Sequence, residues 1–191
     1  MARVGVLALQ GDVREHVAAL EAVGASVTTV RTPAQLAGLD GVVFPGGEST
    51  AIAHLLTSSG LRPVMEGALR DGLPVFGTCA GLILLSSTVL DGREDQWSFG
   101  ALDVTVRRNG YGRQIASFET PIAVAGVGNV PGVFIRAPRM TAWGDVEVLA
   151  TYNHGDGEHP VLVRSGSAWG CSFHPELTED VRVHQLFVDS L

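Results

Sequence analysis

Cys79 lies in the segment Gly77-Thr78-Cys79-Ala80-Gly81, where a predicted buried strand gives way to a predicted helix. Small residues on both sides of a nucleophile are typical of the elbow turn that points its side chain into a cleft. A place just before a helix favours the thiolate, and the Ala80 N–H could stabilise an oxyanion. Taken alone, the segment is equally consistent with a buried structural cysteine in a glycine-rich turn.

His174-Pro175-Glu176 directly follows the predicted strand Ala168–Phe173. A nucleophilic cysteine needs a base, and the base needs an acceptor that orients it. By itself the tripeptide would more often be a solvent-exposed loop. Because both motifs follow the carboxyl ends of predicted strands, where open α/β sheets place their sites, together they predict a Cys-His-Glu triad.

A third segment, Pro45 to Thr50, again follows a predicted strand and precedes a predicted helix. Its adjacent glycines allow the backbone to approach a ligand, and their N–H groups can point at a developing negative charge. Glu48 could hold the amino group of an amino-acid substrate. The alternative is a tight turn in which Ser49 or Glu48 caps the following helix.

The elements that must position these motifs alternate between strands and helices in the first half of the chain. The predicted strands are Val4–Leu9, Val27–Val30, Gly41–Phe44 and Leu73–Phe76. Helical patterns lie between them, the first with Val13, Val17 and Leu20 on its apolar stripe. Such alternation predicts βαβ units in an open parallel sheet.

The second half is richer in strands, some of them expected to be antiparallel and to extend or flank the central sheet. They are predicted at Phe99–Val106, Ile122–Ala125, Val133–Ile135, Val146–Tyr152, Val161–Val163 and Ala168–Phe173. Val181 to Leu191 is predicted to close the chain as a helix, with Val183, Leu186 and Phe187 on its apolar side. We expect one α/β domain over residues 1–191, a three-layer open mixed sheet, mostly parallel, flanked by helices.

Composition narrows the classes of function. The net charge is −7 and no run of Lys or Arg occurs, which argues against a nucleic-acid partner. No apolar stretch reaches the roughly 20 residues of a membrane span, and the N-terminal apolar run is too short for a signal peptide. Two cysteines cannot build a disulfide framework, so a cytoplasmic location is expected.

Other candidate residues are assigned no chemistry. Cys171 lies in a predicted buried strand and is expected to be a small core residue. The remaining histidines have no metal-ligand spacing to nearby Cys, Asp or Glu; they are His16, His54, His154, His159 and His184. No metal site and no cofactor are predicted.

Six segments spread over nearly the whole chain carry a resemblance to a known family. They are LQGDVREH at 9–16, PGGEST at 45–50, GTCAGLI at 77–83, RNGYGRQ at 108–114, VFIRAP at 133–138 and GCSFHPELTED at 170–180. The chain resembles the class I, or triad, glutamine amidotransferases on a flavodoxin-like sheet. More narrowly, it is similar to the glutaminase subunits of pyridoxal 5′-phosphate synthase, which serve vitamin B6 biosynthesis.

The resemblance implies roles for individual residues. Cys79 would be the nucleophile, His174 the general acid and base, and Glu176 its orienting partner, while the Gly47 and Ala80 amides would form the oxyanion hole. The residues that would bind L-glutamine are Gly47, Glu48, Ser49, Arg108, Ile135 and Arg136, and Gln10 would lie beside the site near a partner interface. The choice of Arg108 over Arg107 rests on the family pattern.

The resemblance also implies a partner. Ammonia from glutamine would pass to a separate (β/α)₈-barrel synthase subunit in a large hetero-oligomeric complex. The sequence departs from the family pattern at Asp12, Gly110 and Tyr111, changes that could alter contact with that partner.

Three other functions stay open. They are a different cysteine hydrolase on a similar sheet, a regulatory subunit without turnover, and a glutaminase that feeds another acceptor. HPE together with PGGES argues against the first, the intact triad against the second, and VFIRAP with RNGYGRQ against the third.

Overall fold

The computed structural model describes residues 1–93, 95–108, 110 and 117–191. Its centre is a seven-stranded sheet in the order β10-β11-β12-β4-β3-β1-β2. The strands are β1 (Arg3–Leu7), β2 (Ser26–Val30), β3 (Gly41–Phe44), β4 (Val75–Thr78), β10 (Glu147–Asn153), β11 (Glu158–Ser165) and β12 (Ala168–Cys171). The five from β12 to β2 are parallel, and β11 and β10 extend them in antiparallel fashion. The predicted open, mostly parallel α/β sheet is confirmed.

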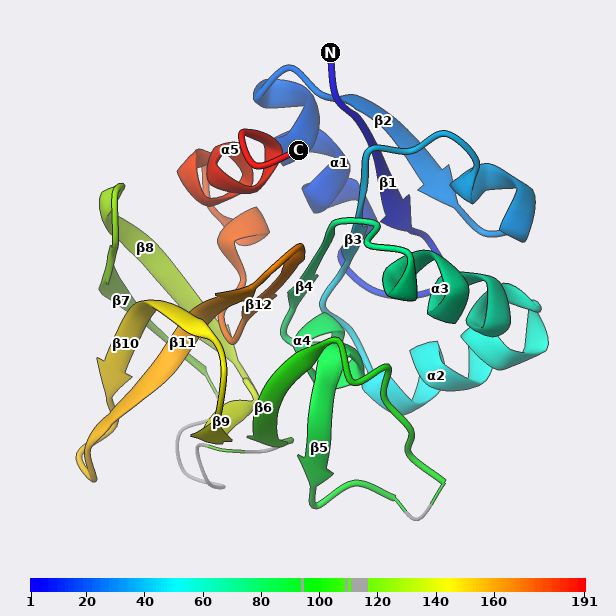
Figure 1. Ribbon diagram of the computed structural model, residues 1–191. Coiled ribbons are helices and arrows are strands. Elements are labelled where there is room, and N and C mark those ends of the chain that lie inside the picture. Colours follow the sequence, from blue (N-terminus) through cyan, green and yellow to red (C-terminus); the bar gives the residue numbers. More distant parts are fainter. Residues whose placement is uncertain (94, 109, 111–116) are drawn as a thin grey trace.

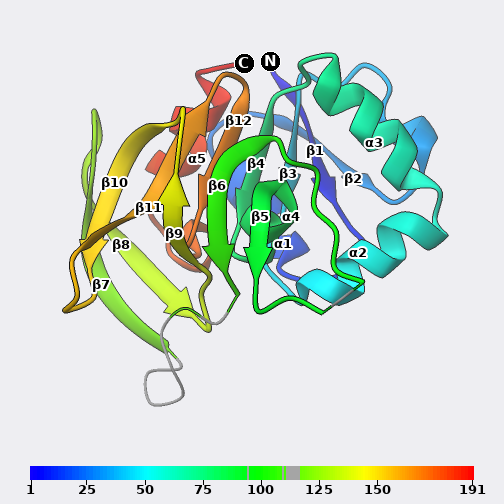
Figure 2. The same cartoon turned by 60° about the horizontal axis from the view of Figure 1, so that its bottom comes forward.

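Helices cover both faces of this sheet and make three layers (Figures 1 and 2). α1 (Val13–Ala22) and α5 (Arg182–Val188) pack together on one face. The other face carries α2 (Ser49–Ser58), α3 (Leu61–Arg70) and α4 (Ala80–Leu85). Two short 3₁₀ turns complete the helical elements, η1 (Pro33–Leu36) and η2 (Pro175–Leu177). In the described part of the chain, no helix is both long and apolar enough to cross a membrane.

The central strands read as unbroken apolar runs because both of their faces are buried. In β3, Val42 and Phe44 belong to the core beneath α2, α3 and α4. Val43, between them, belongs to the core beneath α1 and α5. The site-bearing turns therefore emerge from strands that are held rigidly on both sides.

The strand-rich second half forms two smaller sheets beside the main one. β5 (Ser86–Leu90), β6 (Leu102–Arg107) and β9 (Arg139–Trp143) make one, and β7 (Ser117–Val124) pairs with β8 (Gly128–Ile135) in the other. Every predicted strand overlaps an observed one. The strands β5 and β9 and the helix α3 were not among the predictions, since β5 and β9 have weak apolar patterns and are partly exposed.

The apolar stripes predicted for α1 and α5 face the core, although some of their members are only partly buried. In α1 the buried residues are His16, Ala19 and Leu20, while Val13 and Val17 are only partly buried. In α5, His184 takes the buried place expected for Leu186. Each helix thus turns a histidine toward the sheet.

Candidate active site

The turn between β4 and α4 is a strained elbow that carries Cys79. This residue has φ 47° and ψ −103°, a region that side chains other than glycine rarely occupy. Larger residues would clash at the flanking glycines. A Cβ on Gly81, for example, would lie 2.1 Å from the Phe44 carbonyl oxygen. The Cys79 N–H donates to the Cys171 carbonyl at 2.8 Å, which ties the elbow to β12. The predicted nucleophile turn is present.

Cys79, His174 and Glu176 lie together at the carboxyl ends of β4 and β12. His174 Nδ1 is 2.7 Å from Glu176 Oε1, and Cys79 is close enough to His174 to help raise the pKa of that imidazole. The Cys79 residue is 7% exposed and the His174 residue 4%. The structure therefore brings all three predicted triad residues into one buried cluster.

The charges around His174 favour its protonated form. Burial opposes that charge, but hydrogen bonds with Asp12, Cys79 and Glu176 outweigh burial and raise the pKa of His174. Burial likewise opposes the Glu176 carboxylate, yet His16 and His174 hold the pKa of Glu176 well below its usual range. An imidazolium beside the thiol is the arrangement that stabilises a thiolate nucleophile.

Asp12 adds a second carboxylate to the triad. Its Oδ2 is 3.4 Å from His174 Nδ1. Together Asp12, His174 and Glu176 place three potential ligand atoms within 4.8 Å of one another. The imidazole nitrogen that would bind a cation is already at hydrogen-bond distance from Glu176, so we interpret the three residues as an acid-base cluster.

The loops after β1 and β3 pack against each other beside the triad. Gly11 touches the neighbouring loop so closely that a Cβ there would lie 1.7 Å from the Gly46 carbonyl oxygen. Gln10 Oε1 accepts the Glu48 N–H at 2.8 Å, which brings Gln10 to the loop that contains Gly47, as predicted. Ala80 begins α4 directly after the nucleophile. That the Gly47 and Ala80 amides meet at one oxyanion remains a prediction.

Glu48 and Arg108, two predicted glutamine contacts, are bound to each other. Arg108 Nη2 donates to Glu48 Oε1 at 2.7 Å, and the same carboxylate accepts the N–H groups of Thr50 and Ala51 at 3.0 and 2.7 Å. Glu48 is therefore also the cap of α2, so the capping alternative holds for this residue. Arg107 instead pairs with Asp91 at 3.0 Å. Of the two arginines, Arg108 is the one whose side chain reaches the Pro45–Thr50 loop.

The remaining predicted contacts differ in exposure. Ser49 is buried, and its hydroxyl has no hydrogen-bond partner among the described residues. Ile135, which ends β8, is 38% exposed, and Arg136 follows it at a strained φ of 43°. The His174 N–H donates to the Val133 carbonyl at 2.8 Å, which holds the end of β8 beside the triad. Of the RNGYGRQ segment, residues 109 and 111–114 lie outside the described residues.

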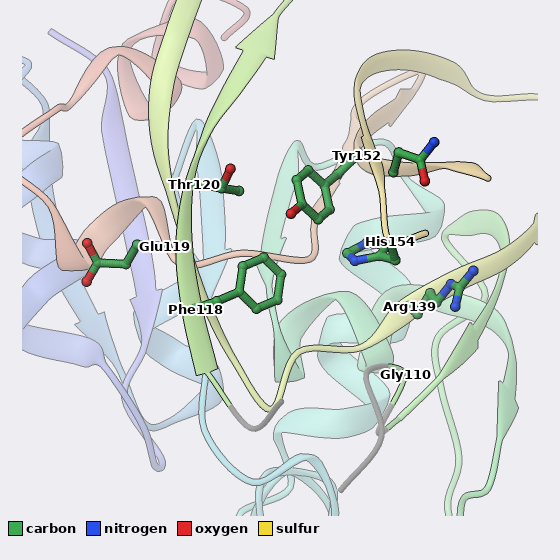
Figure 3. Close-up of a pocket in the computed structure, with 8 residues that line it drawn as sticks. Gly110, Phe118, Glu119, Thr120, Arg139, Tyr152 and His154 are labelled. Carbon is green, nitrogen blue, oxygen red and sulfur yellow. The ribbon is translucent and has the colours of Figure 1, made fainter. Parts of the chain in front are cut away.

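A cavity of about 650 Å³ lies elsewhere in the molecule (Figure 3). Phe118, Tyr152 and His154 gather at this pocket, and Arg139 and Gly110 also line it. Among the described residues of its wall, none is a predicted site residue. The lining residues do not include Cys79, His174 or Glu176, so we assign the cavity no role in the chemistry of Cys79.

Sequence reasoning missed the residues behind the triad. His16 and His184 are both fully buried, and His16 contacts Glu176, although neither has a metal-ligand spacing that would have drawn notice. The available signal was proximity to motifs: His16 ends LQGDVREH, and Asp12 is a departure within it. Histidine occurs on both buried and exposed faces of helices, so the apolar periodicity of α1 and α5 could not show that His16 and His184 are buried.

Comparison with known proteins agrees with this geometry. The relatives include the pyridoxal 5′-phosphate synthase subunits PdxT of Mycobacteroides abscessus and of a Parafrankia species. The first is 56% identical over 97% of this chain and 95% of the relative, and the second 55% identical over 98% and 92%.

Solved structures extend the likeness to three dimensions. One, described as a glutamine amidotransferase, matches with a TM-score of 0.90 and 46% identity over 98% of this chain and 97% of that chain. Another, described as PurLQS from Thermotoga maritima, has a TM-score of 0.74 over 98% of this chain and 98% of that one; at 19% identity it supports the fold alone. Residues 6–191 match the sequence model of the SNO glutamine amidotransferase family, and the chain belongs to that family.

Proposed function

We propose that this protein hydrolyses L-glutamine to L-glutamate and ammonia at Cys79, as the glutaminase subunit of a pyridoxal 5′-phosphate synthase. The observation that carries the proposal is the buried cluster at the ends of the paired strands β4 and β12, where Cys79 follows one strand and His174, with its Nδ1 2.7 Å from Glu176, follows the other. Membership of a glutamine amidotransferase family supports glutamine as the amide donor. The names of the relatives support the vitamin B6 pathway as the destination of the ammonia.

The reaction begins with attack of the Cys79 thiolate on the carboxamide carbon of glutamine. A C–S bond forms, and the carbonyl oxygen becomes an oxyanion that the Gly47 and Ala80 N–H groups would hold. His174 then protonates the departing nitrogen, the C–N bond breaks, and ammonia leaves a thioester on Cys79. Since Glu176 occupies Nδ1, Nε2 is the nitrogen available for this transfer.

Water completes the cycle. His174, now neutral, removes a proton from water as it attacks the thioester carbonyl, and the second oxyanion collapses to glutamate with release of the thiolate. The buried Glu176 carboxylate stabilises His174 each time it is protonated. The net reaction consumes one glutamine and one water and yields one glutamate and one ammonia.

Glutamine would bind along the loop after β3 and the end of β8. Arg108 presents a planar guanidinium suited to the substrate carboxylate, and Glu48 a carboxylate suited to its amino group. Both are now engaged with each other, so binding exchanges their ion pair for pairs with the two ends of the amino acid. Ser49, Ile135 and Arg136 would line the rest of the path.

The ammonia would pass to a separate barrel-shaped synthase subunit in a larger complex. Ammonia that escapes into neutral solution is mostly protonated and no longer nucleophilic, which favours direct delivery. Gln10 is suited to respond to such a partner, because its side chain holds the Glu48 N–H beside Gly47. Glutamate release should therefore increase when the synthase subunit is added.

Cys79→Ala tests the proposal. In the complex with the synthase subunit, the variant should lose glutaminase activity and covalent labelling by diazo-oxonorleucine, a glutamine-analogue electrophile. Cys171→Ala is the matched control, since Cys171 is a buried thiol whose Sγ donates to the Phe173 carbonyl. Undiminished glutamate release by Cys79→Ala would refute the assignment, and absence of labelling at Cys79 in the native chain would indicate a binding-only subunit.

A further inference from the structure

Two histidines lie sealed behind the triad, and the reaction described above does not use them. His16 comes from α1 and His184 from α5, two helices that lie side by side on one face of the sheet (Figure 1). Both residues are 0% exposed. A buried imidazole is costly unless its nitrogens find partners, so the partners of this pair show what the pair does.

The pair forms a chain of contacts that ends on the triad carboxylate. His184 Nε2 is 3.0 Å from His16 Nδ1. His16 Nε2 is 3.0 Å from Thr78 Oγ1 and 3.4 Å from Glu176 Oε1. Thr78 immediately precedes Cys79, so the chain joins both helices, the nucleophile turn and the triad acid.

With both imidazoles neutral, one arrangement of protons suits these contacts. Glu176 is ionised and can only accept, so the His16 nitrogen beside it, Nε2, must carry the proton. His16 Nδ1 is then an acceptor, and His184 Nε2 must donate to it. The opposite tautomer would set a lone pair against the carboxylate and bury a His184 Nδ1–H that has no hydrogen-bond partner among the described residues.

We propose that His16 is a positioning residue, whose Nε2–H is shared between Thr78 Oγ1 and Glu176 Oε1, and that His184 fixes the tautomer of His16. The inference rests on the proposed hydrolase function and deepens it. The other Glu176 oxygen, Oε2, is buried with no hydrogen-bond partner in the described part of the chain. Oε1 therefore carries both contacts, with His174 in front and His16 behind.

The remaining titratable groups around Glu176 do not replace this donor. Asp12 faces His174 at 3.4 Å and carries negative charge itself. Burial raises the pKa of the Cys171 thiol, with Glu176 and Cys79 adding to the effect, so that thiol stays neutral. Burial lowers the pKa of His184 to about 3, which leaves it a neutral donor.

The test measures Cys79 itself rather than turnover. The rate of Cys79 alkylation by iodoacetamide is followed against pH in the isolated chain, with Cys171→Ala as background. Without the His16 donor, Glu176 holds its charge less well and stabilises the imidazolium less. His16→Leu should raise the pH of half-maximal alkylation by about one unit, the effect of losing a hydrogen bond to a charged group.

Rescue separates a donor from a packing residue. The Nε2 amide of His16→Gln can take the place of the imidazole Nε2–H, so this variant should keep the alkylation profile close to that of the native chain. In the complex, His16→Leu should lower kcat about tenfold with little change in KM. Leu56→Ala, a fully buried change in the core on the opposite face, controls for loss of stability.

The outcomes are distinct. A His16→Leu profile that coincides with that of Leu56→Ala would overturn the inference, as would a His16→Gln profile displaced as far as that of His16→Leu. The expected rise in the pH of half-maximal alkylation in His16→Leu, seen in a protein that does not hydrolyse glutamine even with the synthase subunit, would count against the proposed function alone. If His16→Leu does not fold, nitrogen NMR of the unsubstituted protein decides: both histidines should be Nε2–H tautomers, and an Nδ1–H signal from His16 overturns the proposal.

Discussion

The reacting residues and the substrate-binding residues are built in opposite ways. Cys79, His174 and Glu176 are buried and follow strands that the core holds on both faces. Glu48 and Arg108 sit on loops, and the Glu48 side chain is 53% exposed. Under the proposed function, the difference means that the chemistry is preorganised, whereas recognition would depend on groups that exchange partners when glutamine binds.

The largest effect is expected on the buried side. His174→Asn should lower kcat by about 10²–10⁴-fold, the usual contribution of a positioned acid and base, while KM changes little. Steady-state glutamate release in the complex measures both quantities. His54→Asn, an exposed histidine on α2, is the matched control and should behave as the native chain. A large rise in KM for His174→Asn would break the division between reaction and recognition.

Glu176→Gln should have an intermediate effect. It keeps the size of the side chain but removes the charge behind His174, so kcat should fall about ten- to hundredfold.

The same change should alter the dependence of stability on pH. Because the pKa of Glu176 is lower in the folded chain than its ordinary 4.5, its contribution is present above pH 4.5 and is lost as the pH falls through the folded value. Urea unfolding at a series of pH values should therefore show a steeper acid loss in the native chain than in Glu176→Gln. Parallel curves would contradict the ionised, charge-paired state of Glu176.

The smallest effect is expected on the exposed side. Arg108→Ala should raise KM for glutamine about tenfold with kcat within about twofold, since it removes one charged hydrogen-bonding group from the substrate. Unfolding free energy should change by about 1 kcal/mol or less, because the Glu48 partner of Arg108 is half exposed to solvent. Arg107→Ala is the matched control, because Arg107 pairs with Asp91 away from the loop. Equal KM values for Arg108→Ala and Arg107→Ala would contradict the prediction that Arg108 binds glutamine.

Much of the site could be predicted because its motifs are local. GTCAG and HPE each occupy a few consecutive residues after a strand, and parallel strands bring their carboxyl ends to one edge. PGGES was less determined: the sequence left Glu48 as either a substrate contact or a helix cap, and in the folded chain its carboxylate both caps α2 and pairs with Arg108. The parallel sheet was equally readable, since strands buried on both faces leave continuous apolar runs.

By itself, the sequence predicted Cys79, His174 and Glu176 as a triad and determined the sheet that aligns them, because these depend on adjacent residues and short-range periodicity. Only the tertiary structure decided that Asp12 faces His174, that Arg108 reaches Glu48, and that His16 meets His184 behind Glu176. Those partners are separated by as many as 168 residues. No local pattern encodes such contacts, since they depend on how separate helices and loops pack against one sheet.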